Sequence, residues 1–245
     1  MARIVKKFGG TSLGDMERMR QVARKIAESI TMGDQVVVVV SAMAGMTDHL
    51  DDLCQKAVRK CNLQEYDVVM SAGEQISAGL MAILLSDMGI KAKSWLGWQI
   101  PITTDDAHGQ ARIKDVAARL LITDLEQGIV PVIAGYQGVD ETGRVSTLGR
   151  GGSDLTAVAV AAAIKADRCD IYTDVPGVYS DDPRQVSSAR KLPEISYDEM
   201  LENASRGARV LNLAAIELAR DLKIPLQVLS SFEQKTGTMV GPDAS

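Results

Sequence analysis

The hydrophobic residues of this chain switch repeatedly between two spacings, one typical of buried strands and one typical of amphipathic helices. Residues 35–40 contain five consecutive valines, and such a β-branched run suits a strand that is buried on both faces, as in a parallel sheet. Apolar residues in 15–30 recur at helical spacing instead. The alternation of strands and helices along the chain predicts an α/β fold in which helices cover both faces of a sheet.

The same patterns give the expected bounds of the elements. Strands are predicted at 2–8, 35–40, 94–102, 129–136, 169–173 and 225–230, and helices at 15–30, 66–88, 117–127, 153–165, 196–208 and 212–222. Thr47 is expected to cap a further helix whose apolar face holds Leu50, Leu53, Ala57, Val58 and Cys61. Gly73 and Gly79 are expected to interrupt the helix at 66–88, and 141–144 to form a hairpin tip.

Composition and charge narrow the classes of function. The 245 residues are 46% apolar, with 27 Lys and Arg against 32 Asp and Glu, which gives a net charge of −5. This balance argues against a general nucleic-acid binder. The longest uncharged run is about a dozen residues, too short for a membrane span, and no secretion signal is visible. We therefore expect a cytoplasmic protein whose three cysteines are reduced thiols.

Four polar, glycine-rich segments follow predicted strands or precede a predicted helix. They are residues 6–12, 41–47, 147–154 and 173–179. Functional sites in α/β sandwiches lie where parallel strands end at their carboxyl edge. We therefore expect these four segments to meet there and to form a site.

The first and third segments carry residue types that bind anions. Lys7 stands beside Gly9 and Gly10, and backbone N–H groups of such a loop can approach a phosphate closely. Arg150 stands among glycines before a helix start, where it could grip a carboxylate or phosphate with two hydrogen bonds. The alternatives are a tight turn with solvated lysines and, for Asp154, a simple N-terminal helix charge.

The fourth segment and one buried acid complete the candidates. Thr173 and Asp174 follow a strand, and Tyr179 with Arg184 could flank a nucleotide, although a Pro-Gly turn with incidental polar residues is the alternative. Glu74 lies in an otherwise apolar helix, where an unpaired charge is costly. Its partner is either a substrate ammonium group or a structural ion pair.

Several common signatures are missing from the sequence. It contains neither a GxxxxGK[ST] loop nor a GxGxxG fingerprint, and no HRD or DFG motif of a protein kinase. The two histidines, His49 and His108, lie far apart without metal-ligand spacing. We therefore assign no residue to a metal.

Taken together, the segments resemble the amino acid kinase family and, within it, the aspartate kinases. The matching motifs are Lys7-Phe-Gly-Gly-Thr-Ser12, Val40-Ser-Ala-Met43 with Gly45-Met-Thr-Asp48, Ser71-Ala-Gly-Glu-Gln75, Thr147-Leu-Gly-Arg-Gly-Gly-Ser-Asp154, and Tyr172-Thr-Asp-Val-Pro-Gly-Val-Tyr179 with Asp182-Pro-Arg184. The resemblance implies a three-layer α/β/α sandwich around a mainly parallel sheet. It also implies transfer of the γ-phosphate of ATP, with Mg²⁺, to the side-chain carboxylate of L-aspartate, giving 4-phospho-L-aspartate for lysine, threonine and methionine synthesis.

The resemblance also implies a role for each matching residue. Lys7 would neutralise charge on the transferred phosphoryl group, and Asp154 would organise the catalytic centre. The aspartate site would be formed by Ser41, Thr47, Glu74, Arg150 and Ser153. The nucleotide would be held by Lys7, Gly9, Gly10, Ser12, Thr173, Asp174, Tyr179, Arg184 and Arg209.

Two departures from the family pattern bear on these roles. Arg209 stands where the family usually has a lysine near ATP, and Arg is not a neutral replacement for Lys. Asn212-Leu213 replaces a His-Pro or similar pair. Residues 1–240 are expected to form the catalytic domain, its N-terminal part mainly for the amino acid and its C-terminal part mainly for ATP, followed by a short tail at 241–245.

Partners and rival functions stay open at this point. This chain is expected to lack the regulatory ACT domains that usually follow in the family, so a homo-oligomer or a separate ACT-domain partner is possible. A sibling carboxylate or carbamate kinase of the same fold, or a non-catalytic ligand-binding homologue, are the alternative functions. Retention of Lys7, Asp154 and Asp174 argues against the non-catalytic alternative.

Overall fold

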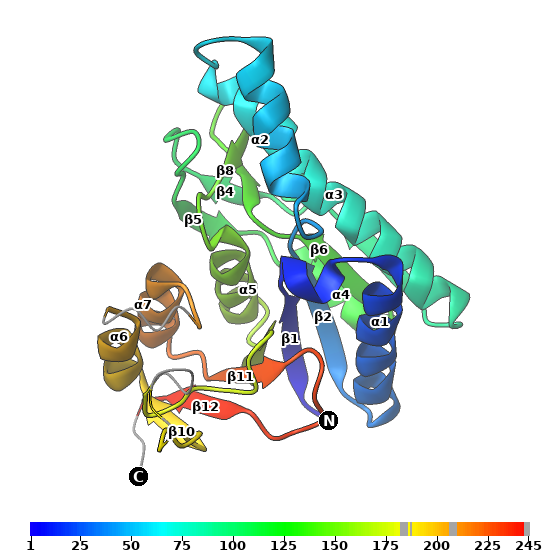
Figure 1. Cartoon of the computed structure of the whole chain (residues 1–245). Coiled ribbons are helices and arrows are strands. Elements are labelled where there is room, and N and C mark those ends of the chain that lie inside the picture. The colour runs from blue at the N-terminus through cyan, green and yellow to red at the C-terminus, as the bar shows by residue number, and fades with distance from the viewer. Residues whose placement is uncertain (182–185, 187, 206–209, 243–245) are drawn as a thin grey trace.

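A computed structural model describes residues 1–181, 186, 188–205 and 210–242 of the chain, and within them the strands form two sheets (Figure 1). The larger sheet has the strand order β10-β12-β11-β9-β1-β2-β6-β3. Its strands are β1 (Arg3–Phe8), β2 (Gln35–Val40), β3 (Ala92–Trp95), β6 (Val130–Ala134), β9 (Arg168–Thr173), β10 (Glu194–Ser196), β11 (Leu226–Ser230) and β12 (Thr238–Gly241). Every pair in it is parallel except β11 with β12.

The smaller sheet has the order β5-β4-β7-β8 and lies beyond one end of the larger one (Figure 1). Its strands are β4 (Ile102–Thr104), β5 (Ile113–Val116), β7 (Gln137–Val139) and β8 (Val145–Thr147). The predicted hairpin tip at 141–144 joins β7 to β8 and is confirmed. The helices are α1 (Met16–Thr31), α2 (Met46–Ala57), α3 (Leu63–Asp87), α4 (Arg119–Glu126), α5 (Gly152–Ala163), α6 (Tyr197–Ser205) and α7 (Leu213–Leu222), with a 3₁₀ turn, η1, at Gly10–Leu13.

The valine run of β2 shows why the molecule has three layers. Val37 and Val39 pack with residues of α4 and α5 on one face, whereas Val36, Val38 and Val40 pack with α1 and α3 on the other. All five valines are buried, because successive side chains of a strand point to opposite faces. The predicted α/β/α sandwich around a mainly parallel sheet is confirmed.

Several predicted bounds are wrong. The strand predicted at 94–102 is two strands in different sheets, β3 and β4, joined by a turn. Short strands that carry no clear pattern, β5, β10 and β12, were not predicted. The helix predicted at 196–208 begins at Tyr197 and is described as far as Ser205; its last predicted residues lie outside the described part of the chain.

Two predictions about glycine and capping also fail, for a packing reason. Neither Gly73 nor Gly79 interrupts α3; a Cβ on Gly73 would lie 2.8 Å from the Cβ of Ala42, so this glycine lets α3 approach the loop after β2. The N-cap of α2 is Gly45, with φ 78°, and Thr47 lies inside the helix. The predicted apolar face of α2 is largely exposed, and only Cys54 is buried in this helix.

Helix α3 is the one helix in the described residues that is long and apolar enough to cross a membrane by length and composition. Core helices meet the same criteria. In this fold 44% of its most apolar window is buried, and Asp67 and Glu74 are buried on it. We therefore interpret α3 as a core helix.

Candidate functional site

A cleft of about 1040 Å³ opens where β1 and β2 end and their loops begin. These two strands are parallel neighbours with Phe8 opposite Val40, so their loops leave the sheet at the same level. Eight of the predicted site residues line the cleft: Lys7, Gly9, Gly10, Ser41, Thr47, Glu74, Arg150 and Ser153. The cleft therefore gathers three of the four predicted segments, although they are far apart in sequence.

The third segment reaches the cleft by a route that the sequence pattern did not indicate. It follows β8 of the smaller sheet rather than a strand of the larger one. Residues 148–151 then lead back from this hairpin to the start of α5. We expected all four segments to follow parallel strands of one sheet. This is wrong for the third segment, because it follows β8, which pairs with β7 as an antiparallel hairpin of the smaller sheet.

Lys7 and Asp154 form a close ion pair at the base of the cleft. The Lys7 Nζ lies 2.6 Å from Asp154 Oδ1, and the two side chains are only 12% and 11% exposed. Asp154 lies in the first turn of α5, where the helix dipole favours a negative charge. Its carboxylate thus holds the Lys7 ammonium at the cleft, while Asp154 itself lies behind the lining residues.

The neighbouring lysine points elsewhere. Lys6 is buried, donates to the hydroxyl of Tyr172 at 3.1 Å and lies 3.8 Å from Asp170. Burial lowers the pKa of Lys6 against the raising effect of Asp170. Because consecutive strand residues face opposite sides, only Lys7 of this pair reaches the cleft.

Glu74 presents an unpaired carboxylate oxygen in a buried position on the cleft. Its Oε1 accepts from the backbone N–H of Ala42 at 3.0 Å, and its Oε2 has no hydrogen-bond partner among the described residues. Burial raises the pKa of Glu74 to about 7, against the lowering effect of the Ala42 hydrogen bond. The alternative of a structural ion pair at Glu74 finds no cation in the described part of the chain.

Arg150 is exposed on the cleft and forms no ion pair with a described residue, while its backbone is fixed. The amide Nδ2 of Asn212 donates to its carbonyl oxygen at 2.9 Å, and Asn212 also caps α7. Gly151, with φ 75°, is needed here because a Cβ would lie 2.2 Å from that amide nitrogen. The Asn212 departure noted in the sequence thus has a defined contact with the Arg150 loop.

The predicted nucleotide residues lie mostly outside the cleft. Ser12 is buried and hydrogen-bonds Ser231 at 2.5 Å. Thr173 ends β9 next to β1, and its hydroxyl donates to Asp174 at 3.0 Å. Tyr179 is half-buried, and its backbone forms an isolated antiparallel β-bridge with Lys191. Arg184 and Arg209 lie outside the described residues.

The lining residues that sequence reasoning missed include Tyr136, Gly109 and Gln110. Tyr136 lies two residues after the end of β6, with φ 69°, and burial raises the pKa of its phenol. Its position after a buried strand could have indicated a site residue, but the strand predicted at 129–136 included Tyr136 as its last residue. Gly109 and Gln110 lie in the loop between β4 and β5, which carried no signal.

Small-molecule phosphotransferases use anion-binding domains of this kind, in which a three-layer α/β sandwich carries a half-buried lysine and glycine-rich loops at its carboxyl edge. The comparisons with known proteins give the particular family. The family model described as "Amino acid kinase family" matches residues 2–230, and the chain belongs to this family.

Two curated relatives of the chain are aspartokinases. The chain is 51% identical over 245 residues to "Aspartokinase" of Geobacillus stearothermophilus, covering 100% of this chain and 60% of the relative. It is 48% identical to "Aspartokinase 2" of Bacillus subtilis, again over 100% of this chain and 60% of the relative. The chain thus spans about 60% of the length of these curated relatives.

Solved structures agree with the sequence relatives. The aspartate kinase of Synechocystis has a TM-score of 0.88 and 44% identity, over 100% of this chain and 40% of that one. E. coli aspartokinase III, in complex with aspartate and ADP, has a TM-score of 0.84 and 31% identity, over 99% of this chain and 65% of that one. The UMP kinase of Bacillus anthracis, at 20% identity and a TM-score of 0.73, shares the fold.

Proposed function

We propose that this chain transfers the γ-phosphate of ATP to the side-chain carboxylate of L-aspartate, giving 4-phospho-L-aspartate. The observation that carries the proposal is the arrangement of charges around the cleft. Lys7, held by Asp154, lies at its base, while the unpaired Glu74 oxygen and the free Arg150 side chain line the same cleft. The aspartokinase names of the relatives support the choice of acceptor.

The acceptor side of the cleft suits an amino acid with two carboxylates. The Glu74 Oε2 would accept from the substrate ammonium, and the Arg150 guanidinium would hold a substrate carboxylate with two hydrogen bonds. Hydroxyl groups of Ser41, Thr47 and Ser153 line the same cleft and would complete the donor set. An ammonium and two carboxylates are thus matched by opposite charges and by neutral hydrogen-bond donors.

The phosphoryl side needs charge neutralisation rather than a protein nucleophile, because the aspartate carboxylate itself attacks the γ-phosphorus. The Lys7 ammonium would stabilise the negative charge that spreads over the transferred oxygens, and the backbone at Gly9 and Gly10 would hold the phosphates. Asp154 keeps Lys7 in place. The nucleotide would extend toward Thr173, Asp174 and Tyr179 at the neighbouring strand end, with Arg184 and Arg209 assigned by family resemblance.

Mg²⁺ fits this site as a companion of ATP. The described residues contain no group of three His, Cys, Asp or Glu side chains that could hold a metal, whereas Mg²⁺ is commonly held by substrate phosphates with one or two carboxylates. Asp174, exposed at the end of β9, is the carboxylate that would contribute. The ion would neutralise charge on the phosphates.

We propose that this reaction begins lysine, threonine and methionine synthesis in the cytoplasm; the aspartokinase names of the relatives support this proposal. An assay of ADP release with aspartate, glutamate and N-acetylglutamate tests the proposal. We expect turnover with aspartate alone. Equal rates with glutamate would indicate a sibling carboxylate kinase, and the absence of turnover with every acceptor would indicate a non-catalytic homologue.

A further inference from the structure

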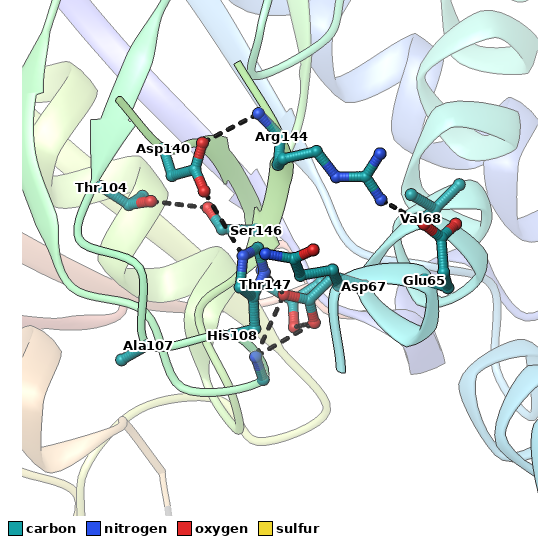
Figure 2. Close-up of polar contacts among 12 residues, drawn as sticks. Glu65, Asp67, Val68, Thr104, Ala107, His108, Asp140, Arg144, Ser146 and Thr147 are labelled. Atoms are coloured by element: carbon teal, nitrogen blue, oxygen red, sulfur yellow. Dashed lines mark hydrogen bonds and ion pairs between the residues drawn. The ribbon is translucent and has the colours of Figure 1, made fainter. Parts of the chain in front are cut away.

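A buried polar cluster lies behind the amino-acid side of the cleft, and it centres on His108 (Figure 2). Its Nδ1 lies 2.8 Å from Asp67 Oδ2 and its Nε2 lies 3.4 Å from Asp140 Oδ2; the His108 side chain is 7% exposed. Because a carboxylate only accepts, Nδ1 carries the proton that is donated to Asp67. Neither carboxylate nor the imidazole is among the residues that line the cleft.

Asp67 joins three separate segments of the chain. It lies on α3, is fully buried, and accepts from the Nδ1 of His108. It also accepts from the backbone N–H of Gly109 at 3.1 Å, and from the backbone N–H and hydroxyl of Thr147 at 3.1 and 2.5 Å. A buried carboxylate is tolerated only when such donors surround it. The loop between β4 and β5 and the end of β8 are therefore tied to α3 at one point.

Each tied segment continues directly into the cleft. Gly109, which follows His108, lines the cleft, and Thr147 is three residues before Arg150. The two segments also contact each other, because the carbonyl oxygen of Gly109 lies 3.3 Å from where a Cβ on Gly149 would stand. A shift of His108 would therefore be passed on to the Arg150 loop.

The third segment carries Glu74. Glu74 lies seven residues after Asp67 in α3. This spacing is two helical turns, so both side chains lie on the same face of the helix, about 10 Å apart along its axis. The Asp67 cluster thus sets where the Arg150 loop lies relative to Glu74. These are the two charged groups that we assign to the substrate carboxylate and ammonium.

We propose that Asp67 and His108 are positioning residues for the acceptor amino acid, which fix the separation between Glu74 and the Arg150 loop. This inference rests on the proposed function. On the far side of the imidazole, Asp140 accepts from the backbone N–H of Arg144 at 2.9 Å. It thereby organises the tip of the β7–β8 hairpin, while the His108 Nε2 that faces it has no hydrogen-bond partner among the described residues.

The test compares how variants of His108 change KM for aspartate with how they change KM for ATP. In His108→Ala the hydrogen bond to Asp67 is lost, and we expect KM for aspartate to rise about 10-fold, because small misplacements of binding groups are costly. KM for ATP should stay within about 2-fold, since the described nucleotide residues lie at the ends of β1 and β9 and none of them hydrogen-bonds Asp67 or His108. In His108→Asn the side-chain amide can still donate to Asp67, so most of the aspartate affinity should return.

A matched control breaks another contact of α3, which joins it to the tip of the β7–β8 hairpin and does not involve Asp67. Glu65 lies on α3 two residues before Asp67 and pairs with Arg144 at the surface, at 2.5 Å (Figure 2). Glu65→Gln should leave both Michaelis constants unchanged. Should His108→Ala fail to fold, Thr147→Val removes one donor to Asp67 with little change of shape, and it should show the same rise confined to aspartate.

The possible results separate this inference from the proposed function. Wild-type protein without aspartate-dependent turnover would overturn both. Wild-type turnover combined with an unchanged KM for aspartate in His108→Ala would overturn the positioning role alone. Equal rises in both Michaelis constants, or no recovery in His108→Asn, would likewise contradict it, because they indicate a general structural role.

Discussion

Replacing Glu74 by glutamine should make the protein more stable at alkaline pH while weakening its binding of the acceptor. Burial raises the pKa of this carboxyl from 4.5 to about 7. In this pH range the folded state keeps a proton that the unfolded state has lost, so the free energy of unfolding falls as the pH rises. At about 1.4 kcal/mol per pKa unit, the loss reaches about 3 kcal/mol by pH 8. Glutamine stays neutral, so this loss is absent from the variant.

Urea unfolding of both proteins at pH 5 and pH 8 measures this effect. Other titrating groups contribute equally to the two proteins and cancel in the difference between them. We expect Glu74→Gln to gain about 2.5 kcal/mol of stability, relative to wild type, between the two pH values. The same variant should lose about 1.5–3 kcal/mol of aspartate recognition, which is the worth of a hydrogen bond to a charged group.

The opposite signs of these two effects make the test sharp. A stability difference between the proteins that does not change with pH would show that Glu74 is ionised in the folded protein across this range. An unchanged KM for aspartate at pH 8 would show that the unpaired Oε2 does not face the substrate ammonium. Either result would refute the corresponding step of the reasoning.

Three further substitutions test other parts of the site. Lys7→Ala should lower kcat on the order of 10²-fold, and circular dichroism should show that the fold is retained. Turnover at the wild-type rate would show that another cation stabilises the transferred phosphoryl group. Arg150→Ala should cost about 1.5–3 kcal/mol in aspartate recognition and leave the affinity for a non-hydrolysable ATP analogue unchanged in calorimetry; a large loss of nucleotide affinity would place Arg150 on the other side of the cleft. Asn212→Ala removes the α7 cap and the bond to the Arg150 carbonyl, and should lower the free energy of unfolding by about 1 kcal/mol; no change in urea unfolding would show that water replaces both contacts.

The layers of the fold could be predicted from the sequence because burial leaves a direct pattern. The valines of β2 face both helical layers, and a run of five β-branched residues has few other uses. The short strands β5, β10 and β12 could not be predicted, since three or four residues carry no reliable period. The expected interruption of α3 at Gly73 was wrong, because this glycine is needed for close packing against Ala42 rather than for a break.

The site was predictable where a residue type that binds anions or polar groups stands at the carboxyl end of a predicted strand. Lys7 lies at the carboxyl end of β1 and the Ser41 segment follows the adjacent parallel strand β2, so the rule about carboxyl edges applies to both. Arg150 comes from a hairpin of the second sheet, and its arrival at the cleft depends on tertiary packing. His108 and Asp67 gave no signal at all, because their partners are brought together by contacts between residues 41 apart in the sequence.

Trapping of the product is the most direct test of phosphoryl transfer to a carboxylate in this cleft. An acyl phosphate reacts with hydroxylamine to give a hydroxamate, which mass spectrometry identifies. With ATP, Mg²⁺, L-aspartate and hydroxylamine, the protein should form the 4-hydroxamate of aspartate in step with ADP, and Lys7→Ala should form it on the order of 100-fold more slowly. ADP release without hydroxamate, or hydroxamate formed from glutamate at an equal rate, would contradict the assignment of aspartate as the phosphoryl acceptor.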